Sequence, residues 1–171
     1  MLTPGSPVPE LKLPLTIGAQ YHLSKQSPEN FTLVVFYRGY HCPICRSQLK
    51  ELGQKLDQFT ERGVNVVAVS MDPEERAMKI DEKWDTGDVP LAYGMSEESA
   101  REWGLYVSDG REDSDETPVF SEPGLFLVRP DGTLYFASVQ NAPFTRPPLD
   151  ELIQGIDYVL KAGYPVRGTR V

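Results

Sequence analysis

Residues 31–46 read FTLVVFYRGYHCPICR, and this stretch decides the fold class. Its first part, Phe31 to Tyr37, is a nearly continuous apolar run with the length of a strand that is buried on both faces of a sheet. The run ends at Arg38-Gly39, and Cys42 and Cys45 follow directly. The stretch therefore predicts a central strand that leads straight into a pair of cysteines.

An amphipathic helix is predicted beyond the cysteines. Its inward face is formed by residues spaced 3, 4 and 3 apart, namely Leu49, Leu52, Leu56 and Phe59. Gly63 is a suitable residue to end this helix. Two cysteines at this spacing would equally suit half of a zinc site. The succession of a strand, a glycine, the cysteine pair and a helix is a far more specific sign of a redox site.

The remaining elements follow from local patterns. We expect a short hairpin at 11–23, a buried strand at 64–69, a helix that starts at Asp72-Pro73 with Asp72 as its cap, a short helix at 96–103, a surface loop at 108–117, a hairpin of strands 124–128 and 133–137, and a helix at 149–160 that Gly163 ends. Strand–helix–strand implies a parallel crossover, and the hairpin adds antiparallel strands. The order predicts an α/β domain spanning 1–171, with a mixed sheet between helices, an N-terminal extension and a helical insertion between the central strands.

Composition limits the classes of partner. The 171 residues carry a formal net charge of -8, which argues against nucleic acid and against an anionic membrane surface. The N-terminal residues do not have the pattern of a signal peptide, and no apolar run is long enough to cross a membrane. We therefore expect a cytoplasmic protein. Two cysteines this close cannot connect distant parts of a fold, so they indicate catalysis, redox sensing or metal binding.

The position of the cysteines at a helix start predicts their chemistry. Backbone N–H groups at a helix N-terminus stabilise a thiolate, and Pro43 suits the first helical position. We expect Cys42 to be exposed and acidic, and Cys45 to be buried and less acidic. Burial of the Cys42 sulfur by the fold would argue against the redox interpretation. Arg38 and Arg46 would add positive potential or remain solvated, and His41 would shuttle protons near neutral pH or remain an ordinary loop residue.

At this point the residues resemble a known family. Four segments look like the peroxiredoxin-like branch of the alkyl hydroperoxide reductase/thiol-specific antioxidant (AhpC/TSA) family: the stretch 35–49, the entry Gly5-Ser6-Pro7-Val8-Pro9-Glu10-Leu11, the segment 64–72 and the hairpin 123–132. That family belongs to the thioredoxin superfamily, so the resemblance implies a thioredoxin-like fold. It also implies that Pro123 is the superfamily's cis-proline, opposite the cysteines. Arg146 matches an arginine of some peroxiredoxins, and we assign it no role from the sequence.

Several family features are missing. Typical peroxiredoxins carry a Pro seven residues and a Thr or Ser three residues before the first cysteine, where this chain has Val35 and Gly39. Pro123 stands where an arginine that polarises peroxide usually precedes the Gly-Leu-Phe strand. Phe36 replaces the buried acid of thioredoxin. These departures leave few donors for a breaking O–O bond and favour disulfide exchange.

Three functions remain open. The first is a thiol–disulfide oxidoreductase in which Cys42 is the nucleophile and Cys45 the resolving thiol. The alternative is a two-cysteine peroxidase with the same two roles, and the third is a metal-binding or interaction module. For either enzyme we expect no cofactor and no metal. We also expect a thiol or disulfide partner, either a protein or a small thiol, and for the peroxidase a hydroperoxide. We leave open whether the protein forms a homodimer.

Overall fold

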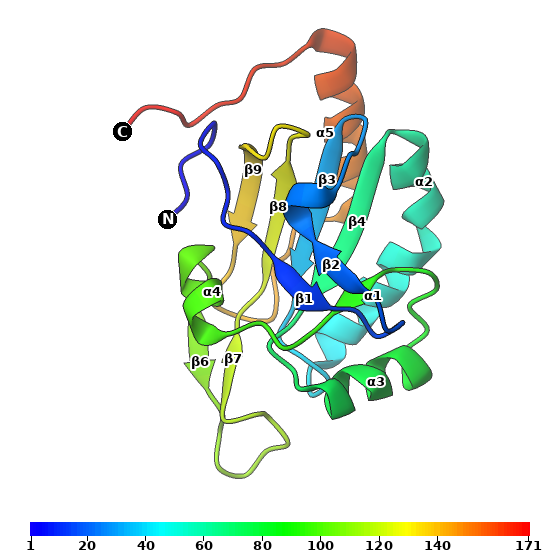
Figure 1. The fold of residues 1–171 in the computed structure, drawn as a ribbon, viewed down its shortest axis with the longest axis vertical. Helices are drawn as coiled ribbons and strands as arrows, with labels where there is room; N and C mark the ends of the chain where they lie inside the picture. The colour runs from blue at the N-terminus through cyan, green and yellow to red at the C-terminus, as the bar shows by residue number, and fades with distance from the viewer.

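The computed structural model describes residues 1–171, and its centre is a five-stranded mixed sheet (Figure 1). The strand order is β5 (Leu91–Ala92), β4 (Val64–Val69), β3 (Phe31–Phe36), β8 (Gly124–Val128) and β9 (Leu134–Val139). β4 pairs in parallel with β3 and β5, whereas β8 pairs antiparallel with β3 and β9. The predicted thioredoxin-like α/β architecture is confirmed.

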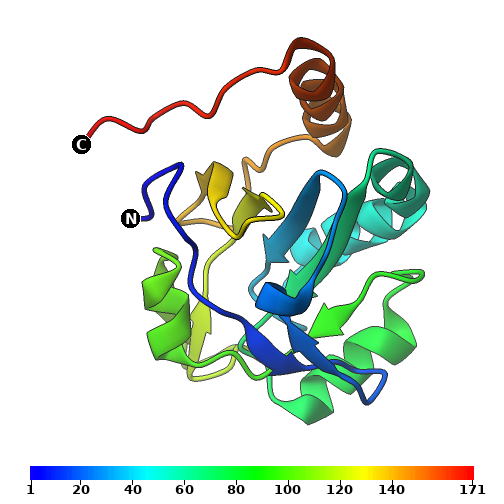
Figure 2. The ribbon, with the colours of Figure 1, turned by 45° about the horizontal axis from the view of Figure 1, so that its top comes forward.

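Helices and the N-terminal extension cover the two faces of the sheet (Figure 2). One hydrophobic cluster joins the sheet to α1 (Pro43–Gln54), α2 (Leu56–Glu61), α3 (Glu74–Lys83) and α5 (Leu149–Ala162). The other joins it to the hairpin of β1 (Lys12–Pro14) and β2 (Gln20–His22), the short helix η1 (Leu23–Lys25) and α4 (Glu97–Glu102). β3 is buried at all six positions, as its apolar sequence predicts.

Most of the predicted elements are present. The hairpin at 11–23, the strand at 64–69, the short helix after Ser96 and the C-terminal helix all form, and Gly163 ends α5 in the left-handed conformation. The loop at 108–117 was predicted without strands. It is instead the tip of a small hairpin of β6 (Val107–Asp109) and β7 (Val119–Ser121).

Two local predictions are wrong. The single helix expected from the cysteines to Gly63 is divided at Lys55, whose backbone (φ -103°, ψ 4°) departs from the helical conformation and which ends α1 and precedes α2. Asp72 does not cap α3, because Pro73 occupies the N-cap position and no side chain caps that helix. The Asp72 carboxylate instead accepts a hydrogen bond from the Tyr40 N–H, in the loop before the cysteines.

None of the helices is both long and apolar enough to cross a membrane.

Candidate active site

Cys42 is the N-cap residue of α1, directly beyond the carboxyl end of β3. Its backbone is extended, Pro43 takes the first helical position, and the Cys45 N–H donates to Cys42 Sγ at 3.2 Å. The Cys42 N–H in turn donates to the Gly39 carbonyl at 3.1 Å. The helix start predicted from the sequence is therefore present, and it holds the first sulfur against the helix N-terminus.

The two thiols differ in acidity. The pKa of Cys42 falls to about 6, first because the Cys45 thiol donates a hydrogen bond to the Cys42 sulfur. The Cys45 N–H, the charge of Arg146 and a hydrogen bond from Arg38 lower it further. Together these effects exceed the rise in pKa that burial causes. Burial, and then the neighbouring Cys42, raise the pKa of Cys45 well above its ordinary value. Both cysteines are free thiols. This order matches the expected nucleophile and resolving thiol.

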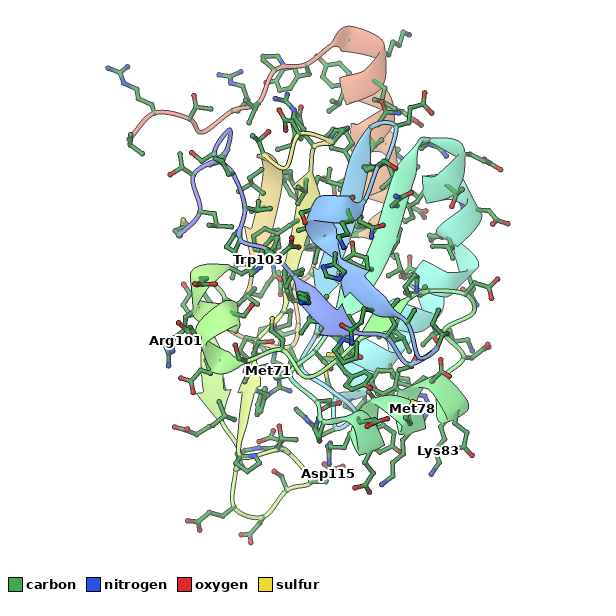
Figure 3. All side chains as sticks on the ribbon, viewed as in Figure 1. Met71, Met78, Lys83, Arg101, Trp103 and Asp115 are labelled. Atoms are coloured by element: carbon green, nitrogen blue, oxygen red, sulfur yellow. The ribbon has the colours of Figure 1, made fainter.

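The expected exposure of Cys42 is wrong, since only 1% of the residue is accessible. The reason is tertiary: Cys42 belongs to the main core cluster, and Arg146, from a distant segment, lies against its sulfur. Cys42 nevertheless lines a cavity of about 230 Å³ together with Tyr40, His41, Pro43, Arg46, Trp84 and Asp115. Figure 3 labels Asp115, which the β6–β7 loop brings toward α3. The burial of Cys42 counts against the redox interpretation, whereas its place in the lining of this cavity gives a small reactant a route to the residue.

Arg146 touches both sulfurs, and the sequence had assigned it no role. Its Nη2 lies 3.1 Å from Cys45 Sγ and 3.9 Å from Cys42 Sγ. Nη1 donates to Gln48 Oε1 at 2.6 Å, and Nε donates to the Pro143 carbonyl at 2.8 Å, so the guanidinium is fixed on three sides. The match to an arginine of some peroxiredoxins was the only signal in the sequence, because Arg146 follows Cys42 by 104 residues.

Arg38 lies between the cysteine loop and two acidic residues, one on each side of β7 in the sequence. Its Nε is 3.0 Å from a Glu122 carboxylate oxygen, and its Nη2 is 3.8 Å from Glu116. Its guanidinium also stacks over the Phe120 ring at 4.7 Å. Arg38 is among the groups that lower the Cys42 pKa, although two carboxylates share its charge.

His41 packs against Phe120, with the ring centroids 4.7 Å apart, and neither ring nitrogen has a hydrogen-bond partner. Burial and then the charge of Arg38 lower the pKa of His41 to about 4. An imidazole with such a pKa is neutral at pH 7. This argues against the proton-shuttle role considered from the sequence.

Pro123 is not a cis-proline, because the chain has no cis peptide bond. The Glu122 N–H bonds to the Tyr106 carbonyl at 2.7 Å, and the Pro123 carbonyl accepts the Gln140 N–H at 3.0 Å. These bonds carry the chain in extended form from β7 into β8, so a trans peptide fits here and the prediction is wrong.

No group of three or more His, Cys, Asp or Glu side chains is placed to hold a metal ion. An acidic cysteine at a helix N-terminus, with a second thiol one turn further on and a mixed sheet behind it, defines a thioredoxin-superfamily thiol protein. The family model of the AhpC/TSA family matches residues 4–137. The chain belongs to this family and is peroxiredoxin-like.

Individual relatives agree with this assignment. Rv2521, a Mycobacterium tuberculosis protein provisionally named a peroxiredoxin, is 33% identical over 106 residues, which are 61% of this chain and 66% of that relative. The structure of Mycobacterium tuberculosis AhpC has a TM-score of 0.77 at 18% identity over 99% of both chains. The reduced Plasmodium vivax 2-Cys peroxiredoxin has a TM-score of 0.77 at 19% identity, over 95% of this chain and 84% of that one. At these identities the two structures support the fold alone.

Proposed function

We propose that this protein is a thiol peroxidase in which Cys42 reduces a hydroperoxide and Cys45 resolves the product. The contact of Arg146 with both sulfurs carries the proposal. The sequence favoured disulfide exchange because the usual donors for a breaking O–O bond are missing. Arg146 supplies such a donor from a different part of the chain, and a fixed cation beside the developing negative charge is an effective form of catalysis.

Burial of Cys42 supports the same choice. A protein disulfide must bring its sulfur into line with the attacking thiolate, which a 1% exposed cysteine does not allow without rearrangement. A hydroperoxide group is small enough for the cavity of about 230 Å³ beside the sulfur.

The proposed reaction has two internal steps. The Cys42 thiolate attacks one peroxide oxygen, the S–O bond forms as the O–O bond breaks, and the alkoxide or hydroxide that leaves takes up a proton. Cys42, now a sulfenic acid, is attacked by the Cys45 thiol, which forms the disulfide and releases water. Two thiols of a reductant, either a small thiol or a redox protein, then restore the pair.

The test is hydroperoxide consumption in the presence of dithiothreitol, for the wild type and two variants. Cys42→Ser is expected to abolish turnover. Cys45→Ser is expected to form one sulfenic acid per chain, trapped by dimedone, and to turn over slowly. Reduction of insulin disulfides by the wild type without any peroxide consumption would contradict the proposal and favour the thiol–disulfide oxidoreductase.

A further inference from the structure

Asp72 is a buried carboxylate that the proposed chemistry does not use. Its side chain is 0% exposed, and it follows the carboxyl end of β4. Oδ2 accepts the Tyr40 N–H at 2.8 Å, while Oδ1 lies 3.5 Å from Arg76 Nε, beyond good hydrogen-bond distance. Burying a carboxylate with so few partners costs free energy, so its presence calls for an explanation.

The loop that Asp72 holds is the one that ends at Cys42. Gly39 has a φ of +138°, and a Cβ there would lie 2.6 Å from Asp72 Oδ1, so the loop backbone is pressed directly against the carboxylate. The Gly39 carbonyl in turn accepts the Cys42 N–H at 3.1 Å. Asp72 thus contacts Gly39, and Gly39 is hydrogen-bonded to the backbone of Cys42, the nucleophile.

The Tyr40 side chain, in the same loop, contacts two residues of the α3 segment, Arg76 and Trp84. Tyr40 stacks on Trp84 with ring centroids 6.0 Å apart, and the Arg76 guanidinium that faces Asp72 lies 5.7 Å from the Tyr40 ring. The Tyr40 backbone and side chain are therefore both fixed from β4 and α3.

We propose that Asp72 is a positioning residue, which sets the Gly39–Tyr40 loop so that Cys42 Sγ meets the helix N-terminus and Arg146. Its role rests on the proposed function only in taking Cys42 as the nucleophile. Asp72 acts as a hydrogen-bond acceptor in this role. Its negative charge works in the opposite direction, because an anion near Cys42 disfavours the thiolate.

These two effects have opposite signs, which makes the test specific. The pKa of Cys42 is read from thiolate absorbance near 240 nm in a Cys45→Ser background. Asp72→Asn keeps an acceptor for Tyr40 N–H and loses the charge, so we expect the pKa to stay the same or fall. Asp72→Ala loses the acceptor, so we expect the pKa to rise and alkylation by iodoacetamide at pH 7 to slow about fivefold.

Three further variants complete the experiment. Gly39→Ala disturbs the same contact from the loop side and also strains the backbone at its φ of +138°, so it should raise the Cys42 pKa at least as much as Asp72→Ala does. Asp131→Ala is the matched control, since Asp131 also accepts a backbone N–H, that of Thr133, but lies in the β8–β9 turn. It should leave the Cys42 pKa unchanged.

A fall in the Cys42 pKa in both Asp72 variants would mean that Asp72 acts on Cys42 only through its charge, and it would overturn the proposal. An unchanged pKa in folded Asp72→Ala or Gly39→Ala would do the same. Alkylation does not need peroxide. If the wild type consumed no peroxide, the proposed function would be wrong, but the test of Asp72 by alkylation would still be valid.

Discussion

The acidity of Cys42 comes from one group close to it in the sequence and from another that is far away in the sequence. Cys45 acts from one helical turn away, whereas Arg146 comes from the segment between β9 and α5. Arg146 interacts more closely with Cys45 than with Cys42 in the reduced protein, at 3.1 Å against 3.9 Å. A single cation thus faces both the attacking and the resolving sulfur.

The pH dependence of Cys42 reactivity follows from its lowered pKa. The thiolate is the reactive form, so the alkylation rate should rise as the pH increases through about 6 and level off above it, instead of rising near 9 as for an ordinary thiol. Stopped-flow alkylation of the reduced wild type between pH 4 and 10, with the modified cysteine identified by mass spectrometry, measures this midpoint, because Cys45 keeps its hydrogen bond to Cys42 and its own raised pKa leaves it protonated. A midpoint near the ordinary cysteine value would contradict the geometry of the site.

Replacing Arg146 tests the cation separately. Arg146→Ala should move that midpoint to higher pH, because a positive charge beside the thiolate is lost. It should also slow the reaction with peroxide by about 100-fold or more, if Arg146 stabilises the breaking O–O bond. Arg101→Ala on α4, labelled in Figure 3 and paired with Glu97, is the matched control that should change neither. Equal peroxide rates in both variants would remove Arg146 from the mechanism.

At the scale of elements, α1 joins the site to the core. Leu49 and Leu52 are fully buried in the cluster that also contains both cysteines. Leu49→Ala should lower the free energy of unfolding by about 2–5 kcal/mol, because it leaves a cavity under the helix. Leu160→Ala on α5, where the side chain is 42% exposed, should cost about 0.5 kcal/mol or less. Urea denaturation of the reduced proteins compares the two, and similar losses would mean that α1 is not anchored through this contact.

The elements were predictable where the information is local. The β3 run, the spacing of Leu49 and Leu52, and the Cys42-Pro43 helix start each lie within a few residues, and all three predictions agree with the structure. The division at Lys55 was not visible, because a helical pattern continues across it. The site was predictable in its cysteines, in Pro43 at the helix start and in the charge of Arg38. Arg146 and Asp72 reach it through the packing of distant segments, and a capping pattern gave Asp72 the wrong role.

At the scale of the whole molecule, Cys42 lies where the two ends of the insertion meet. α3 begins the insertion and the β6–β7 hairpin ends it, and the Arg76 guanidinium bonds to the Asp115 carbonyl at 2.8 Å. From the other side, Glu116 lies 3.8 Å from Arg38 and 3.1 Å from Arg111. The contacts of Arg76 and Arg38 hold the loop at 110–118 beside the cavity that Cys42 lines, whereas the Glu116–Arg111 pair lies within the loop.

Shielding by this loop predicts selectivity by size. Iodoacetamide should react with wild-type Cys42 much faster, relative to a free thiol, than the bulky disulfide 5,5′-dithiobis(2-nitrobenzoate) does. Glu116→Gln weakens the attachment of the loop and should raise the rate with the bulky disulfide several-fold, with little change for iodoacetamide. Glu112→Gln makes the same change of charge at an exposed position of the same loop, so it controls for the attraction of the anionic reagent. Equal gains in both glutamate variants would mean that charge alone governs access. A bulky reagent that attacks the wild type as fast as the unfolded chain would show that the loop does not shield Cys42.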